Sequence, residues 1–167
     1  MDMTIKGIPE IADVSSQWYD YLAIHEVEEV NLIKSGREWY EAVSHLQPLN
    51  MDQIDFAGTN EPGETVKYEL RVFARSSEMT SFRLKSGDDN LALLPVSGVD
   101  ISSSTGTYAR EAFLSASFDP MLNSDPISLE YHNNGDANAR GWLDYLLVHS
   151  RKKIIYDGSP LYVRDHK

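Results

Sequence analysis

An alternation of apolar and mostly charged side chains over residues 65–75 constrains the fold more than any other feature of this sequence. The apolar side chains at every second position are Val66, Tyr68, Leu70, Val72 and Ala74. The positions between them, mostly charged, are Lys67, Glu69, Arg71, Phe73 and Arg75. Successive side chains of a strand point to opposite faces of its sheet, so the pattern predicts one face on a core and one largely in water. Half-buried strands of this kind are typical of antiparallel sheets.

Shorter runs rich in aromatic and β-branched residues predict further strands. They cover residues 18–27 with a continuation toward 33, then 81–85, 91–96, 110–118, 127–131 and 141–151. We expect residues 37–40 to begin another extended or short helical piece, and residues 45–63 to form loops around at most a short strand. A last hairpin is expected over residues 153–164, around Asp157-Gly158-Ser159-Pro160. Many short strands without sustained helical periodicity predict an all-β fold, an antiparallel β-sandwich of the jelly-roll type.

The length of 167 residues predicts one domain. We expect residues 1–16 to be an approach segment and residues 17–167 to form a single β-sandwich domain. No apolar run is long enough to cross a bilayer, so no membrane-spanning segment is expected. The first four residues are acidic and polar, which is untypical of a signal peptide, and we expect the sequence to be an excised piece of a longer protein.

The charge and the cysteine content exclude several classes of function. A net charge of −11 argues against nucleic acid and anionic lipid as partners, because both require clustered Lys and Arg. The one basic run, residues 151–153, is expected to be a solvated turn. The chain has no cysteine, which excludes disulfides, thiolate metal sites and a cysteine nucleophile within it.

The densest apolar run near the C-terminal end is residues 141–151, with the sequence GWLDYLLVHSR. Its composition predicts a strand in the middle of a sheet. Asp144 is out of place there, and if it is buried it needs hydrogen bonds from backbone N–H groups or a cationic partner, for which Arg37 and Arg151 are the first candidates. Truncating a buried, paired Asp144 to alanine is then expected to cost about 3–5 kcal/mol. The alternative is that Asp144 lies at a strand end and reaches water.

Few groups have the spacing of a metal site. Residues 25–29 (HEVEE) resemble the start of a zinc-peptidase helix, but Glu29 stands where a second histidine is needed, and the segment is predicted to be a strand. Asp88-Asp89-Asn90 and residues 133–138 (NNGDAN) could supply oxygen ligands to calcium, but both have the composition of hairpin turns and neither has EF-hand spacing. No serine-hydrolase or phosphate-loop motif occurs. We therefore expect neither a metal site nor a cofactor.

The aromatic side chains allow two interpretations. Packed inside a sandwich they would supply much of the buried area, and exposed on one sheet face they would suit the stacking of sugars. Core packing is favoured. The set is Trp18, Tyr19, Tyr21, Trp39, Tyr40, Tyr108, Tyr131, Trp142 and Tyr145.

Two blocks of the sequence resemble one known family. Residues 142–151, WLDYLLVHSR, followed by KKIIYDGSPLYVR, look like the "LDY…R" segment ahead of the catalytic domain in PorU-type proteins. Residues 25–40, HEVEEVNLIKSGREWY, are similar to the pattern HE.EE.NLL.SGREWYG of the same proteins, and the blocks occur in the family's order. The resemblance departs at Glu41, where the family usually has glycine. The residues that carry it most are Gly36, Arg37, Glu38, Trp39, Tyr40, Trp142, Asp144, Tyr145 and Arg151.

The resemblance implies a non-catalytic accessory or scaffold domain. PorU-type proteins are gingipain-like cysteine peptidases that act as the sortase of the Bacteroidetes type IX secretion system at the cell surface, on the exterior of the outer membrane. Such a parent would remove the C-terminal signal of secreted cargo and join the cargo to anionic lipopolysaccharide, with a Cys/His pair that is not in this segment. The implied partners are the downstream peptidase domain of the same protein, secreted cargo or secretion-system components.

Two other classes of function stay open from the sequence. One is a free-standing carbohydrate-binding module, which would show a row of exposed aromatic side chains on one sheet face. The other is a small hydrolase, which would show a cleft with convergent titratable groups.

Overall fold

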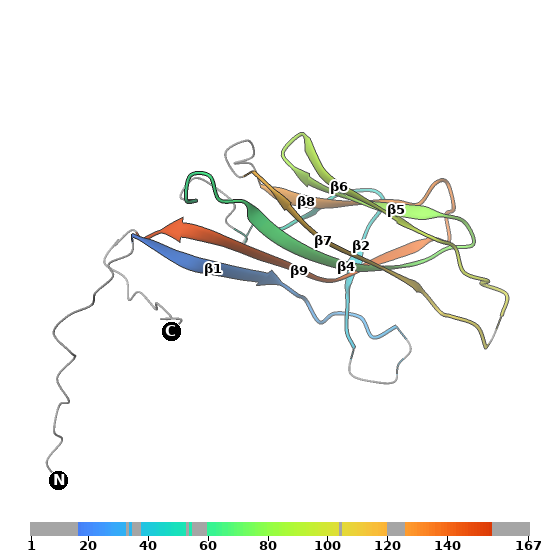
Figure 1. The fold of residues 1–167 in the computed structure, drawn as a ribbon. Coiled ribbons are helices and arrows are strands. Elements are labelled where there is room, and N and C mark those ends of the chain that lie inside the picture. The colour runs from blue at the N-terminus through green and yellow to red at the C-terminus, as the bar shows by residue number, and fades with distance from the viewer. Residues whose placement is uncertain are drawn as a thin grey trace, which may run out of the picture.

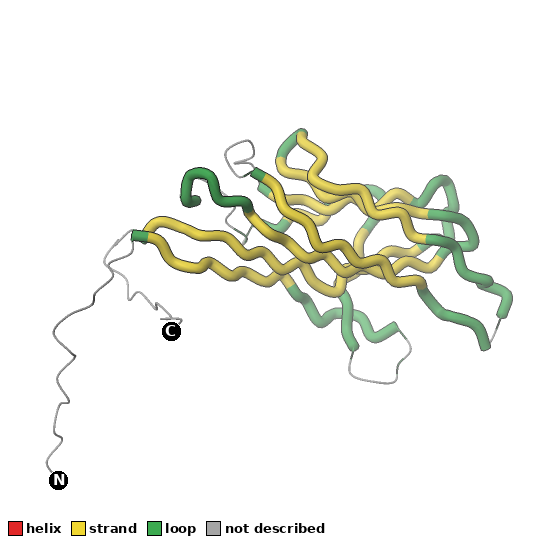
Figure 2. The backbone as a smooth tube through the Cα atoms, in the orientation of Figure 1, coloured by secondary structure: helices red, strands yellow, loops and turns green. Residues whose placement is uncertain are grey.

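The computed structural model describes residues 17–32, 34, 38–52, 54, 60–103, 105–119 and 126–154, so the expected approach segment and nearly all of the expected last hairpin lie outside the described residues. In these residues the structure consists of strands and loops (Figure 2). The strands are β1 (Trp18–His25), β2 (Glu41–Val43), β3 (Leu49–Asn50), β4 (Val66–Arg75), β5 (Thr80–Ser86), β6 (Asp89–Val96), β7 (Arg110–Phe118), β8 (Ile127–His132) and β9 (Arg140–Lys153). The described part contains no helix with the length and hydropathy that crossing a bilayer requires.

The strands form two antiparallel sheets that pack as layers (Figure 1). The first sheet has the order β1-β9-β4-β7, and β2 pairs with β9 on the side away from β4. The second sheet has the order β3-β8-β5-β6. This arrangement of eight main strands in two sheets is the double Greek key of a jelly roll, which confirms the predicted antiparallel β-sandwich.

The core lies between the two sheets and is built from every second residue of their strands. On β4 the apolar positions Val66, Leu70 and Val72 are at most 1% exposed, as the alternation predicts. From the second sheet the ring of Phe82 packs on the ring of Tyr131, with their centroids 4.8 Å apart. The backbone of β9 passes so close to these two rings that a Cβ on Gly141 would lie 2.8–2.9 Å from them.

The strand β9 is the centre of the first sheet, as the run 141–151 predicts. It pairs with β4 along one side and with β1 and β2 along the other. Its register with β4 shifts once: Arg71 is opposite Tyr145, whereas Val72 is opposite Leu143. Asp144 is therefore the extra residue of a β-bulge, a feature that re-aims side chains.

Two expectations about strand limits are wrong. The strand β1 ends at His25 and does not continue toward residue 33. Residues 26–29, three of them glutamates, are exposed outside the strand, and Val30 then bridges to Tyr40. The basic run 151–153 is the end of β9 and not a solvated turn. Lys152 points to the inner side, is 2% exposed, and has its Nζ atom 4.0 Å from the centre of the Tyr21 ring. A lysine can be accommodated there because the ring attracts the ammonium group.

Candidate functional site

A hollow of about 410 Å³ lies on the outer side of the first sheet, the side that faces away from the second sheet. We call it the outer hollow. It is lined by Ile24, Glu26, Glu28, Glu38, Trp39, Glu69, Arg71, Asp144, Tyr145 and Leu147. These residues come from the end of β1, the β1–β2 connection, β4 and β9.

The pairing of the strands brings the two sequence blocks together at this hollow. His25 at the end of β1 is opposite Leu146, and Glu41 at the start of β2 is opposite Leu143, so both strands flank the same stretch of β9. Glu38 and Trp39, in the β1–β2 connection between them, line the hollow on the outer side. The bulge leaves Asp144 and Tyr145 on that same outer side, because their neighbours Leu143 and Leu146 both face the core.

Asp144 is buried and bound to a cation, as expected, but the cation is Arg71. The Nη1 atom of Arg71 lies 2.8 Å from Oδ2 of Asp144. The same guanidinium donates to Glu111 on β7 through Nε at 3.2 Å and Nη2 at 3.1 Å. Of the two expected partners, Arg151 lies further along β9, where its Nη1 atom is 2.8 Å from Glu61, and Arg37 is outside the described residues.

Burial and the charge of Arg71 shift the pKa of Asp144 in opposite directions. Burial raises the pKa of Asp144 above the usual value of an aspartate, and nearby Glu38 and Glu111 add to the rise, while Arg71 opposes it. Hydrogen bonds to Glu111, together with the charges of Glu111 and Asp144, raise the pKa of Arg71 above its usual value. The arginine thus stays charged, and its charge favours the ionised form of Asp144 against the effect of burial.

Tyr40 anchors the β1–β2 connection on the sheet. Its ring lies 4.8 Å from the ring of Phe73, and its hydroxyl donates to Glu38 at 2.8 Å. Burial raises the pKa of Tyr40 well above the usual value of a tyrosine, and the carboxylate of Glu38 contributes to the rise. The contact orients Glu38 at the rim of the outer hollow.

The lining of the outer hollow is strongly acidic. It contains five carboxylates and one guanidinium, a formal charge of −4. Within the described residues, no group of three or more His, Cys, Asp or Glu side chains is placed to hold a metal ion. His25 of the HEVEE segment turns to the inner side of the sheet edge, where its Nε2 atom lies 2.5 Å from Oε2 of Glu41.

The second sequence considered for calcium is a turn between β8 and β9. Asn134 and Gly135 have φ angles of 50° and 87°, left-handed values that Asn and Gly adopt in tight turns. The expectation of a hairpin turn here is wrong, because β8 and β9 belong to different sheets and the turn connects the two. Asp136 accepts from the backbone N–H of Asn138 at 2.8 Å and from the hydroxyl of buried Ser76 at 2.9 Å. These bonds hold the pKa of Asp136 below its usual value. Both carboxylate oxygens of Asp136 are therefore engaged in hydrogen bonds that stabilise the turn.

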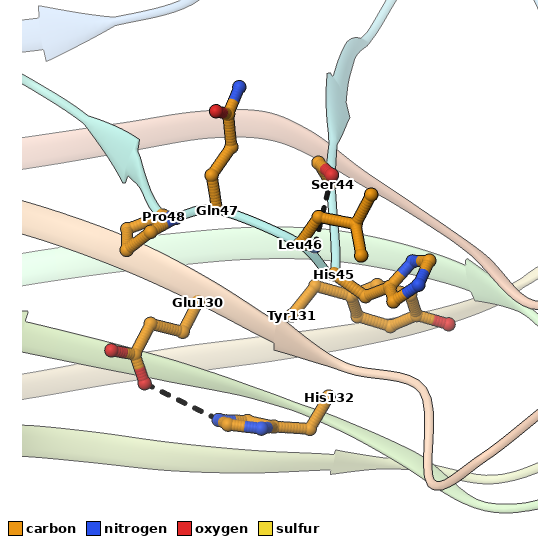
Figure 3. A pocket seen from close by; sticks show the side chains of 8 residues that line it. All are labelled: Ser44, His45, Leu46, Gln47, Pro48, Glu130, Tyr131 and His132. Carbon is orange, nitrogen blue, oxygen red and sulfur yellow. Dashed lines mark hydrogen bonds and ion pairs between the residues drawn. The ribbon is translucent and has the colours of Figure 1, made fainter.

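A second hollow, of about 220 Å³, lies between the β2–β3 loop and β8. Figure 3 shows residues 44–48 of the loop on one side and Glu130 with His132 on the other. Glu130 has three basic side chains around it: Lys85 and the imidazole of His132 at 3.4 Å, and Arg83 at 3.6 Å. The hydroxyl of Ser44 accepts from the backbone N–H of Leu46 at 3.1 Å, which is the geometry of a turn and not of an activated nucleophile.

The structure brings together some of the residues that carry the resemblance. Glu38, Trp39, Asp144 and Tyr145 line the outer hollow, and Tyr40 lies beside it. Trp142 is buried on the same side near Tyr108, with ring centroids 6.5 Å apart. Arg151 lies elsewhere, and Gly36 and Arg37 are outside the described residues.

The sequence did not identify three residues of neighbouring strands as part of the site. Glu69 and Arg71 line the outer hollow, and Glu111 binds Arg71. The available signal was the alternation of β4, which placed Glu69 and Arg71 on one outward face.

Comparison with known proteins yields a structural likeness. No protein-family model matches this chain, and no curated protein is a significant match. Its structure is similar to part of the crystal structure of dimeric latent PorU from Porphyromonas gingivalis, with a TM-score of 0.65 and 21% sequence identity. The likeness covers 96% of this chain and 15% of that chain. The chain therefore has a PorU-like fold and spans 15% of the length of the protein it resembles.

Proposed function

We propose that this chain is a non-catalytic accessory domain of a larger PorU-like surface peptidase, located ahead of the catalytic domain. The observation that carries the proposal is the extent of the structural likeness, 96% of this chain against 15% of the PorU chain. A likeness of these proportions is what one domain of a longer protein would give. The two sequence blocks of the resemblance, which meet at the outer hollow, support the same assignment.

In this role the domain positions the catalytic domain or contacts cargo and other secretion components on the exterior of the outer membrane. The longer protein would carry the Cys/His pair that removes the C-terminal signal of type IX cargo. This chain has no cysteine, so it holds no thiolate nucleophile for that reaction.

The non-catalytic part of the proposal is tested by incubating the purified chain with a peptide that carries a type IX C-terminal signal, beside the longer protein. We expect cleavage by the longer protein alone. Cleavage by this chain that survives repurification and is abolished by a point substitution within it would refute the assignment.

The accessory role is tested by deleting residues 17–154 from the longer protein. We expect signal processing of folded cargo to fall while the peptidase domain still cleaves a short peptide. Unchanged processing of folded cargo would show that the domain has no part in it.

A carbohydrate-binding module is the second candidate, because the outer side of the first sheet carries exposed aromatic rings. Trp39, Tyr108 and Phe113 are 41%, 42% and 52% exposed. They come from three separate elements: the β1–β2 connection, the loop before β7, and β7 itself. Binding of an uncharged oligosaccharide that is lost on substitution of these rings would favour this candidate.

A further inference from the structure

We propose that the outer hollow docks an extended polypeptide segment of a partner, one in which Arg or Lys alternates with aliphatic residues. The inference specifies the docking role of the proposed function and in that sense rests on it. Three properties of the hollow carry it: its exposed apolar surface, its charge, and the spacing of its carboxylates.

The hollow and the adjacent part of β1 carry large apolar side chains that are exposed to solvent. Ile24 is 55% exposed and Trp39 is 41% exposed, and both line the hollow. Leu22, two residues earlier on the same face of β1, is 65% exposed. Contiguous apolar side chains rimmed by polar groups mark interaction sites on soluble proteins.

The negative charge of the hollow favours a positively charged partner. Within the described residues, none of the rim carboxylates Glu26, Glu28, Glu38 and Glu69 forms an ion pair, because Arg71 is already bound to Asp144 and Glu111. A cation that enters the hollow therefore meets several carboxylates that no cation of the described residues neutralises. Trp39 beside the rim adds an aromatic face, on which a guanidinium stacks well.

The spacing of the carboxylates favours an extended occupant over an ion. The described residues include no cluster close enough to hold a metal, so the negative charge is spread over the rim. Spread charge around apolar side chains fits a strand-like segment, whose successive side chains point alternately in opposite directions. A second copy of this chain is disfavoured because each copy carries a net charge of −11.

The test is a titration of the isotope-labelled chain, followed by nuclear magnetic resonance, with three capped five-residue peptides. In each peptide valine alternates with one other residue: arginine, glutamine or glutamate. The chain has three tryptophans, so the indole N–H signals of Trp18 and Trp142 serve as internal controls for that of Trp39. We expect the arginine peptide alone to shift Trp39, with binding that weakens as salt is added.

Matched substitutions locate the binding. Trp39→Ala should weaken it at least about three-fold, the size of a surface cation–π contact, while Tyr108→Ala, equally exposed elsewhere on the same side, should leave it unchanged. Glu26→Gln with Glu28→Gln should also weaken binding at least about three-fold. The control pair, Glu64→Gln with Glu78→Gln, removes the same charge from exposed positions outside the hollow.

Equal binding of the glutamine and arginine peptides, or shifts that spare Trp39, would overturn the proposal. A shift of Trp39 by an uncharged oligosaccharide, without one by the arginine peptide, would overturn it in favour of sugar binding. If the peptides fail while deletion of residues 17–154 still abolishes cargo processing, the docking site is wrong and the accessory role stands.

Discussion

Replacing Arg71 with methionine should destabilise the sandwich more than neutralising its partner Asp144 with asparagine. Arg71 lies 2.8 Å from Asp144 and has a second carboxylate partner in Glu111. In Arg71→Met the side chain of Asp144, 12% exposed, loses its cation while Glu38 and Glu111 still repel its charge. In Asp144→Asn the arginine keeps Glu111, and the amide oxygen can still accept from it. Only Arg71→Met therefore leaves a buried charge without its partner.

The magnitude follows from the burial of the two groups. Removing one partner of a fully buried ion pair costs about 3–5 kcal/mol. The side chain of Arg71 is 29% exposed, so water relieves part of this cost, and we expect a loss of about 2 kcal/mol for Arg71→Met at pH 7. For Asp144→Asn we expect less than about 1 kcal/mol. For Asp144→Ala we expect a loss of stability smaller than the about 3–5 kcal/mol expected from the sequence, because Arg71 still has Glu111 as a partner.

The pH dependence separates this explanation from a simple packing defect. Without Arg71, the pKa of Asp144 in the folded state rises further above its unfolded value of about 3.9. The folded state then binds the proton more tightly, so the stability of Arg71→Met falls as pH rises from the unfolded to the folded pKa. The deficit relative to the wild type should therefore be full at pH 7 and shrink toward pH 4.

The assay is urea unfolding, followed by circular dichroism, of the wild type, both single variants and the double variant at pH 7 and pH 4.5. The double variant should be more stable at pH 7 than Arg71→Met, because the stranded carboxylate is gone. The reasoning is refuted if Asp144→Asn costs as much as Arg71→Met, or if the deficit of Arg71→Met is the same at both pH values.

Two further substitutions test the core by the same unfolding measurement. Gly141→Ala should cost about 1–3 kcal/mol, because its Cβ would lie 2.8–2.9 Å from the rings of Tyr131 and Phe82; wild-type stability would show that these rings can move aside. Leu143→Ala, at a fully buried position, should cost about 2–5 kcal/mol, whereas Leu93→Ala, at a position that is 60% exposed, should change stability by less than about 0.5 kcal/mol.

The fold was predictable because most of its strands can be recognised from local patterns of apolar and polar residues. The alternation of β4 shows directly which of its side chains face the core, and the apolar run that became β9 is dense enough to indicate a central strand. The end of β1 was not predictable in the same way. The strand ends at His25 because this is the last residue of β1 that pairs with β9. A pattern of residue types does not show where a strand loses its partner.

The site was predictable only in part because it depends on register. The apolar neighbours of Asp144 indicated that a buried carboxylate here would need a cation or backbone N–H groups, and left open an exposed strand end. The identity of the cation does not follow from them, because Arg71 is 73 residues away in the sequence and becomes a neighbour only through the β4–β9 pairing. The burial of Lys152 was not predictable for the same reason. The strand β9 is longer than predicted, and Lys152 occupies one of its alternate positions that face inward.

The bulge at Asp144 explains how one strand can serve both the core and the outer hollow. Without the extra residue, strict alternation from Leu143 would turn Tyr145 inward and Leu146 outward. With it, Leu143 and Leu146 both face the core and are fully buried, while Asp144 and Tyr145 share the outer side. The same stretch of β9 lies between its pairings with β1 and β2, so the connection that carries Glu38 and Trp39 leaves and returns there. The bulge is thus the point at which the core, the ion pair and the proposed docking surface depend on one another.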